Sequence, residues 1–338
     1  MNKKNISIKE IAKLSGVSVA TVSRVINNNG RFSEQTRKKV QAVIEATNYE
    51  TNAVAKSLRM KKSNTVGILI PDIRNAFFST LVQKLERYLF EQGYSTIICN
   101  TGRSEEKEAA YLAILNSKMI DGLIVISGQT PFSLKKLTRA IPVVCIDRKP
   151  KAGEGLHVVH SDNHQGGVMA TETLLAGGSK NLLLLTGDPM LSASKHRRQG
   201  FVDTLKKHGF EKTQFTQIEI TSNAKQSQTE LAKEKLLEKA EAGVRFDGVF
   251  ALNDRLALGA IEAAYALDMQ IPQDVQIVGF DDDPISRYCS PKLSTVKQNT
   301  DELAQKAGVA LLKLMAGERL EETQHIVCVE WIQRETTR

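Results

Sequence analysis

Residues 8–27 read IKEIAKLSGVSVATVSRVIN, and this stretch predicts two short helices joined by a tight turn. Apolar positions at helical spacing give the first helix an inward face formed by Ile8, Ile11, Ala12 and Leu14. Gly16 tolerates the positive φ of a sharp turn, and Ser18 can cap the second helix by accepting a hydrogen bond from an unpaired N–H. The inward face of the second helix is formed by Val22, Val25 and Ile26. The stretch is therefore predicted to be a helix-turn-helix.

The outer face of the second helix carries side chains suited to DNA. A helix of this kind lies in the major groove with its first residues against base edges. Val19 and Ala20 offer apolar contact to thymine methyl groups, and Arg24 can donate two hydrogen bonds to a guanine. Thr21 and Ser23 suit phosphate oxygens. We therefore predict sequence-specific DNA binding rather than a helical hairpin inside a core.

Positive charge is concentrated at the beginning of the chain. Residues 1–62 hold 13 Lys and Arg against 4 Asp and Glu, a net charge of +9. The remaining 276 residues hold 33 and 34, a net charge of −1. The whole excess of +8 therefore lies on a small head, which is the electrostatic footprint of a DNA-binding module on a nearly neutral core.

The composition argues against several other classes of protein. No apolar run is long enough to span a membrane, and the beginning of the chain does not resemble a signal peptide, so we expect a cytoplasmic protein with no membrane partner. The four cysteines lie far apart and predict buried free thiols rather than disulfides or a zinc site. We find no Walker loop, no G-x-S-x-G motif and no catalytic pair of carboxylates. The chain is therefore predicted to be no enzyme, with no metal and no cofactor.

The rest of the chain predicts an α/β core after a helical head. Residues 31–47 continue the head as a third helix capped by Ser33. Apolar runs then alternate with amphipathic helices, at 65–70, 94–99, 121–126, 141–146, 181–186, 217–221, 248–252 and 275–281. Such alternation predicts parallel sheets covered on both faces. Because the order occurs twice, we expect a small all-α helix-turn-helix head and an α/β core of two doubly wound parallel-sheet lobes with a cleft between them.

The domain boundaries follow from this alternation and from two expected crossings, near 291–293 and 320–324. We place the domains as a DNA-binding head in 1–50, a hinge helix and linker in 51–62, an N-terminal lobe in 63–162 plus 292–322, and a C-terminal lobe in 163–291 plus 323–338.

Polar and aromatic side chains gather at the carboxyl ends of the predicted strands, where ligands bind in such sheets. They are Asn75, Phe77, Phe78, Asp147, Arg148, Arg197, Asn253, Asp281 and Gln298. Carboxylates, amides and arginines suit the hydroxyl groups of a neutral polyol, and an aromatic ring suits the C–H face of a sugar. Any one of these residues can instead be a core aromatic or a helix cap, but the convergent set predicts a sugar-binding cleft.

These residues resemble the lactose/galactose repressor (LacI/GalR) family. The resemblance covers the whole chain, with matching motifs at 17–27, 52–58, 71–78, 253–254, 278–282 and 293–298. It implies a homodimeric transcriptional repressor with a periplasmic-binding-protein-like core, whose heads bind double-stranded palindromic operator DNA. The family motif also includes Ser18 and Asn27 among the DNA-binding residues. Within the family, the polar set is most similar to that of ribose-operon repressors, which implies ribose as the small-molecule effector.

The same resemblance implies a hinge helix that binds DNA through Asn52, Ala55 and Leu58, with Leu58 wedged between base pairs in the minor groove. Two departures from the family are visible. The residues at 49–52 read Tyr-Glu-Thr-Asn and lack the family's proline. No aromatic residue follows the strand at 217–221, where residues 221–223 read Thr-Ser-Asn.

The resemblance also implies a mechanism: sugar closes the lobes, the hinge helices separate and operator affinity falls. Several alternatives remain open. A co-repressor such as a purine would strengthen DNA binding, although a polyol-like pocket favours induction. A phosphorylated carrier protein would need its own surface on the N-terminal lobe. A sugar-binding transport protein would need a signal segment and would not need the basic helix-turn-helix.

Overall fold

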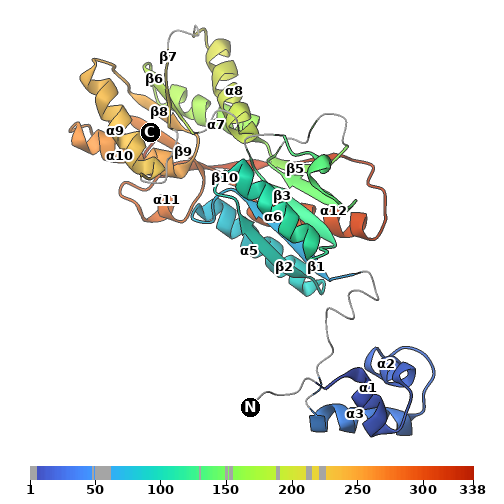
Figure 1. The fold of residues 1–338 in the computed structure, drawn as a ribbon. Helices are drawn as coiled ribbons and strands as arrows, with labels where there is room; N and C mark the ends of the chain where they lie inside the picture. The colour runs from blue at the N-terminus through green and yellow to red at the C-terminus, as the bar shows by residue number, and fades with distance from the viewer. Residues whose placement is uncertain are drawn as a thin grey trace. The chain divides into compact units, whose positions relative to one another are not determined.

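The computed structural model describes residues 6–47, 49, 62–128, 131–148, 151, 155–187, 191–210, 215–220 and 226–338. The chain divides into two compact units, Met1–Ser63 and Asn64–Arg338 (Figure 1). The hinge residues Asn52, Ala55 and Leu58, and the segment 221–223, lie outside the described residues.

The first unit holds helices α1 (Ile8–Ser15), α2 (Val19–Ile26) and α3 (Glu34–Thr47). Local signals in the sequence end and begin these helices. Gly16 follows α1 with a φ of +67°, and the Ser18 hydroxyl accepts a hydrogen bond of 3.1 Å from the N–H of Thr21 at the start of α2. Ser33 caps α3 in the same way, accepting from the N–H of Thr36 at 3.1 Å. The predicted helix-turn-helix is therefore confirmed, and its small core is formed by Ile11, Ala12, Val22, Val25 and Val40.

The prediction that Leu14 lies on the inward face of the first helix is wrong. Leu14 is 61% exposed, whereas Ser15 is buried and donates a hydrogen bond of 2.6 Å to the carbonyl of Ile11. Residues three, four and seven positions apart share one face of an α-helix. Ser15, and not Leu14, therefore continues the face that begins at Ile8.

The first lobe of the second unit is built on a parallel sheet whose strand order is β11-β5-β4-β3-β1-β2. Its strands are β1 (Thr65–Ile70), β2 (Ser95–Asn100), β3 (Gly122–Ile126), β4 (Val143–Ile146), β5 (His157–Ser161) and β11 (Gln324–Val327). Helices α5 (Ala76–Glu91) and α12 (Thr300–Met315) enclose one core with the sheet, through residues such as Leu85 and Leu311. Helix α6 (Glu105–Ser117) encloses the core on the other face, and the short 3-10 helix η1 (Leu134–Lys136) packs beside it.

The second lobe has the strand order β12-β10-β9-β8-β6-β7. Its strands are β6 (Leu182–Thr186), β7 (Phe215–Glu219), β8 (Gly248–Ala251), β9 (Gln276–Asp281), β10 (Ser294–Gln298) and β12 (Val329–Ile332). Helices α7 (Asn163–Ala176) and α8 (Ser192–Lys207) cover one face, while α9 (Gln228–Glu241) and α10 (Asp254–Ala266) cover the other. The short helix α11 (Ile285–Tyr288) follows β9 (Figure 1). Two doubly wound lobes are therefore confirmed, with one departure, since β12 pairs antiparallel with β10.

Three details of the predicted organisation are wrong. The strand β5 was not predicted, because His157 and His160 interrupt its apolar run. The strand β10 pairs with β9 and lies in the second sheet, although 292–322 was assigned to the first lobe. The strand β11 pairs with β5 and lies in the first sheet, although 323–338 was assigned to the second. The last two crossings therefore follow β10 and β11. A short apolar segment carries no signal for which sheet it joins, because pairing depends on the neighbouring strand in space.

The cysteines depart in part from the prediction. All four are free, and Cys99 and Cys145 are buried as predicted. Cys289 is only half-buried and Cys328, between β11 and β12, is exposed. Within the described ranges, no group of His, Cys, Asp and Glu is arranged to hold a metal ion. None of the helices described here combines the length and the apolar character that crossing a membrane requires.

Candidate functional site

The predicted DNA-binding side chains lie along α2. Ser18, Val19, Ala20 and Arg24 are exposed, as a surface that meets DNA requires. Ser18 also has a structural role as the cap of α2, and its hydroxyl lies 2.9 Å from that of Thr21. Two of the predicted contacts therefore also stabilise the helix that presents them.

Two further predicted contacts, Ser23 and Asn27, lie at the end of α2 beside Arg24. Asn27 donates from Nδ2 to the carbonyl of Ser23 at 2.7 Å and to the Ser23 hydroxyl at 3.3 Å. The aliphatic part of Arg24 lies beside Gly30, in the loop that leads to α3. The exposed polar surface of the head therefore extends from the beginning to the end of α2.

In the second unit, the structure brings four of the predicted effector residues into one hydrogen-bonded group. We call it the central ring, and it consists of Asp147, Ser161, Asn163, Arg197, Asp281 and Gln298. Asp147 and Ser161 lie at the carboxyl ends of β4 and β5 in the first lobe. The remaining members come from α7, α8, β9 and β10 of the second lobe. The central ring therefore spans both lobes at the point where the chain passes between them.

Arg197 is the main donor of the central ring. It donates from Nε to Oδ1 of Asn163 at 2.8 Å and from Nη1 to the carbonyl of Leu252 at 2.6 Å. Nη1 also lies 3.3 Å from Oδ1 of Asp281, and Cζ lies 3.6 Å from the ring centroid of Phe280. The guanidinium is thus oriented by acceptors in its plane and by an aromatic ring on its face.

The amide side chains connect the charged members of the central ring. Asn163 donates from Nδ2 to Oδ1 of Asp147 at 3.1 Å while its own oxygen accepts from Arg197. Gln298 donates from Nε2 to Oδ1 of Asp281 at 2.6 Å and accepts from the Ser161 hydroxyl at 2.6 Å. Each amide therefore links one lobe to the other.

The carboxyl groups of the central ring are buried and hold their protons more tightly than usual. Burial raises the pKa of Asp281 to about 7, although the positive charge of Arg197 acts in the opposite direction. Burial likewise raises the pKa of Asp147, again against Arg197. Both residues also have positive φ angles, +49° for Asp147 and +118° for Asp281. Perturbed carboxyls and strained backbone together are typical of functional sites.

Four predicted effector residues lie outside the central ring. Asn75 and Asn253 cap helices α5 and α10, accepting from the N–H groups of Phe77 and Leu256 at 2.9 Å each. The rings of Phe77 and Phe78 are buried in the core under α5, 5.4 Å apart and edge to face. In the structure, Asn75 and Asn253 therefore cap helices, while Phe77 and Phe78 pack in the core.

The ninth predicted residue, Arg148, follows Asp147 directly and binds Glu108 of α6 in the first lobe. It forms two hydrogen bonds to the carboxylate of Glu108, at 2.6 and 3.2 Å. The effector-binding role of Arg148 stays a prediction.

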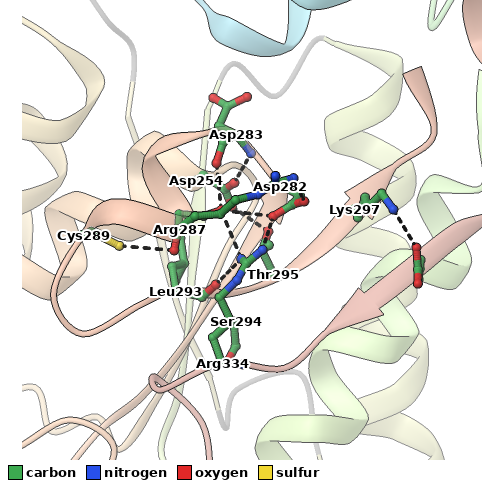
Figure 2. Close-up of polar contacts among 12 residues, drawn as sticks. Asp254, Asp282, Asp283, Arg287, Cys289, Leu293, Ser294, Thr295, Lys297 and Arg334 are labelled. Carbon is green, nitrogen blue, oxygen red and sulfur yellow. Dashed lines mark hydrogen bonds and ion pairs between the residues drawn. The ribbon is translucent and has the colours of Figure 1, made fainter. Parts of the chain in front are cut away.

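The loop after Asp281 is held by a second polar group (Figure 2). Asp282 binds Arg287 at 2.8 Å and Arg334 at 2.5 Å. Asp254 is fully buried, accepting from the Thr295 hydroxyl at 2.6 Å and from the N–H of Asp283 at 2.7 Å. Burial raises the pKa of Asp254 well above its usual range. These contacts fix the backbone on which Asp281 lies, and thereby its position in the central ring.

Ser161 and Asn163 of the central ring were not predicted from the sequence. Both flank the end of β5, the strand that was not recognised, so the rule of polar residues at strand ends was not applied there. If the run His-Val-Val-His-Ser had been accepted as a short strand despite its two histidines, the same rule would have identified both residues. In total, the site offers carboxylate, amide and guanidinium groups in a buried setting, which is the chemistry that recognises several hydroxyl groups on one small neutral ligand.

Comparison with known proteins extends these observations. Residues 7–52 match bacterial regulatory proteins of the lacI family, and residues 171–337 match a periplasmic binding protein-like domain. The ribose operon repressor of Halalkalibacterium halodurans is 33% identical over 332 residues, covering 98% of this chain and 97% of that protein.

Two solved structures share the fold. A lac repressor dimer bound to operator and an anti-inducer has a TM-score of 0.86 at 24% identity, covering 99% of each chain. A LacI family transcriptional regulator from Enterococcus faecium with bound ribose has a TM-score of 0.71 at 27% identity, covering 81% of this chain and 98% of that one. The predicted family is confirmed by the identity to a curated relative over nearly the whole length. The chain belongs to the lacI family of bacterial regulatory proteins.

Proposed function

We propose that the chain represses a sugar-utilisation operon and leaves its operator when ribose binds between the two lobes. The observation that carries this proposal is the central ring, which connects both lobes through buried groups suited to sugar hydroxyls. The name of the Halalkalibacterium relative and the ribose in the Enterococcus structure support the same ligand. The lacI family consists of regulatory proteins, which confirms the prediction that the chain is not an enzyme.

Each part of the site would have a distinct role. Asp147 and Asp281 would accept hydrogen bonds from ribose hydroxyls, and Arg197 would donate to them. Asn253 and Gln298 would contribute amides that both donate and accept. Phe77 and Phe78 would form an apolar wall from the first lobe, and Asn75 would hold the start of α5 beside them.

Repression would come from the head. We propose that two chains associate and place their α2 helices in two half-sites of a palindromic operator, since a two-fold symmetric dimer matches such a site. The exposed residues of α2 would contact bases and phosphates, and Asn52, Ala55 and Leu58 would contact the minor groove between the half-sites.

Ribose would act by changing the equilibrium between lobe arrangements. If ribose lowers operator affinity by a given factor, operator must lower ribose affinity by the same factor. A measured decrease in both affinities would distinguish an inducer from a ligand that binds without affecting the operator.

Calorimetric titration of the purified chain with ribose, and with a panel of other sugars and a purine, tests the ligand. Fluorescence anisotropy of labelled operator with and without ribose tests the coupling. We expect saturable ribose binding and release of the operator. Binding of a different sugar would overturn ribose, and tighter operator binding with any ligand would show co-repression instead.

A further inference from the structure

Glu108, Lys136 and Arg148 form a charged group in the first lobe, which we call the Glu108 cluster. Arg148 donates from Nη1 to Oε2 of Glu108 at 2.6 Å and from Nη2 to Oε1 at 3.2 Å. Lys136 donates to Oε1 of Glu108 at 2.8 Å. Arg148 and Glu108 are both buried, with side chains 3% and 9% exposed. A planar guanidinium thus meets a carboxylate in the bidentate geometry that favours a strong pair.

The fold holds Arg148 on two further sides. Its Cζ lies 5.3 Å from the ring centroid of Phe132. Its guanidinium also lies against the backbone of Gly128, where an added Cβ would come within 2.6 Å of Cζ. Gly128 has a φ of +156°, a conformation that L side chains rarely adopt. The orientation of Arg148 toward Glu108 is therefore determined by its surroundings as well as by the ion pair.

The Glu108 cluster borders a pocket at the carboxyl ends of β1 to β4. Arg148, Glu108, Arg103 and Glu105 all line this pocket. Arg148 is also the residue next to Asp147 of the central ring, so the pocket adjoins the proposed ribose site. A substituent on a bound sugar that extends toward the first lobe would meet this charged lining.

The charge of Arg148 decides what such a substituent can be. Arginine binds phosphate in the same bidentate manner as carboxylate. Here that geometry is already occupied by Glu108. Burial by itself would raise the pKa of Glu108, but the hydrogen bonds from Arg148 and Lys136 outweigh it and hold the pKa below its usual range. Glu108 is therefore a carboxylate at neutral pH.

We propose that Glu108 is a specificity-determining residue that acts by positioning and neutralising Arg148, so that the effector site selects a neutral pentose over a pentose phosphate. This inference rests on the proposed function and concerns which form of the sugar the site accepts. A buried ion pair contributes little net stability compared with apolar packing, whereas it can specify one arrangement. Discrimination between ligands through an unfavourable charge is a common use of such groups.

The test is the ratio of two affinities measured by calorimetry, for ribose and for ribose 5-phosphate. Wild type should bind ribose and discriminate against ribose 5-phosphate. Glu108→Gln keeps the shape of the side chain but removes its charge. It should raise the affinity for ribose 5-phosphate on the order of tenfold while changing ribose affinity much less, because the charge acts at short range on the phosphate. The gain should shrink in high salt.

Three control variants separate positioning from charge alone. Glu105→Gln removes an exposed carboxylate from the same helix and the same pocket, and it should leave the ratio unchanged. Glu108→Gln combined with Arg148→Met should lose the gain, since the phosphate would then lack its partner. Glu108→Asp keeps the charge at a shorter reach and should give a smaller gain, which provides a second test if Glu108→Gln fails to fold.

The outcomes distinguish this inference from the proposed function. No gain for ribose 5-phosphate in either Glu108 variant, or an equal gain in Glu105→Gln, would overturn the role of Glu108. Equal binding of both ligands by wild type would also overturn it. A wild type that ignores ribose while Glu108→Gln gains ribose 5-phosphate would refute ribose as effector but support the selection against phosphate.

Discussion

Nη1 of Arg197 lies 3.3 Å from Oδ1 of Asp281, and the same guanidinium lies 3.6 Å from the ring centroid of Phe280. The two charged residues come from α8 and β9, 84 positions apart in the chain. Because Asn163 and the carbonyl of Leu252 also accept from Arg197, its orientation is set before any ligand arrives. Preorganisation of this kind lowers the entropic cost of binding.

Arg197→Ala should abolish ribose binding and leave operator binding intact. Removing Arg197 leaves the buried acceptors of Asn163 and Leu252 without this donor, so we also expect a loss of about 1–3 kcal/mol in the unfolding free energy of the core. Calorimetry with ribose and anisotropy with operator check the two activities. Arg198→Ala changes the exposed neighbour on the same helix and should stay within about 0.5 kcal/mol of wild type. Equal ribose binding by both variants would contradict the role of Arg197.

Asn163→Ala should weaken ribose binding roughly tenfold, because hydrogen bonds to charged groups contribute about 1.5–3 kcal/mol and Asn163 orients both Arg197 and Asp147. Titration with ribose measures the loss. His164→Ala alters the next, exposed residue and serves as the control. If the two variants bind ribose alike, the central ring does not position the ligand groups.

Ser18→Ala and Ser33→Ala each remove a helix cap from the head, and each should cost about 1 kcal/mol of stability. Only Ser18 lies at the helix proposed to enter the major groove. Operator affinity should therefore fall further in Ser18→Ala than in Ser33→Ala, measured by anisotropy at one salt concentration. A matched loss in both variants would mean that Ser18 affects DNA binding only through head stability.

The stability of the core should decrease as the pH rises from about 5 to about 8. The native state holds a proton on Asp281 up to a pKa of about 7, whereas the unfolded chain releases it near pH 4. Asp283, whose pKa burial raises to about 6, acts in the same direction. The native state thus binds more protons across this interval, so its stability is greatest at the acidic end and is lost as the pH rises.

Urea unfolding of the chain at pH 5 and at pH 8 measures this effect. Asp281→Asn removes one of the contributors and should reduce the difference between the two midpoints. Glu108 and Asp282 cannot cause the effect, because their hydrogen-bonded partners hold their pKa values below the usual range. A difference unchanged by Asp281→Asn would show that Asp281 is ionised throughout.

Elements with local signals were predicted well. The caps Ser18 and Ser33 and the glycine after α1 act within one turn of helix, so a few residues contain the whole signal. The alternation of strands and helices was equally readable, because buried parallel strands are nearly continuous apolar runs. The strand β5 was missed since two histidines break its run, and with it Ser161 and Asn163 were missed.

The sequence predicted the residue types that the central ring brings together, but not their arrangement. Asp147, Arg197, Asp281 and Gln298 were selected because polar residues at strand ends converge on one edge of a sheet, and the structure joins them in one hydrogen-bonded group. Arg148 satisfied the same rule and yet turns to Glu108, a residue that nothing in the sequence singled out. The rule selects positions along the chain, and it does not say which way a side chain points.

By itself, the sequence determined a basic helix-turn-helix head and an α/β core with two lobes. These depend on periodicity, capping and composition, which are properties of neighbouring residues. Only the tertiary structure decided which sheet β10 and β11 join, which residues form the central ring and which carboxylate pairs with Arg148. These features depend on contacts such as that between Ser161 and Gln298, which are 137 positions apart and meet only when both sheets have formed.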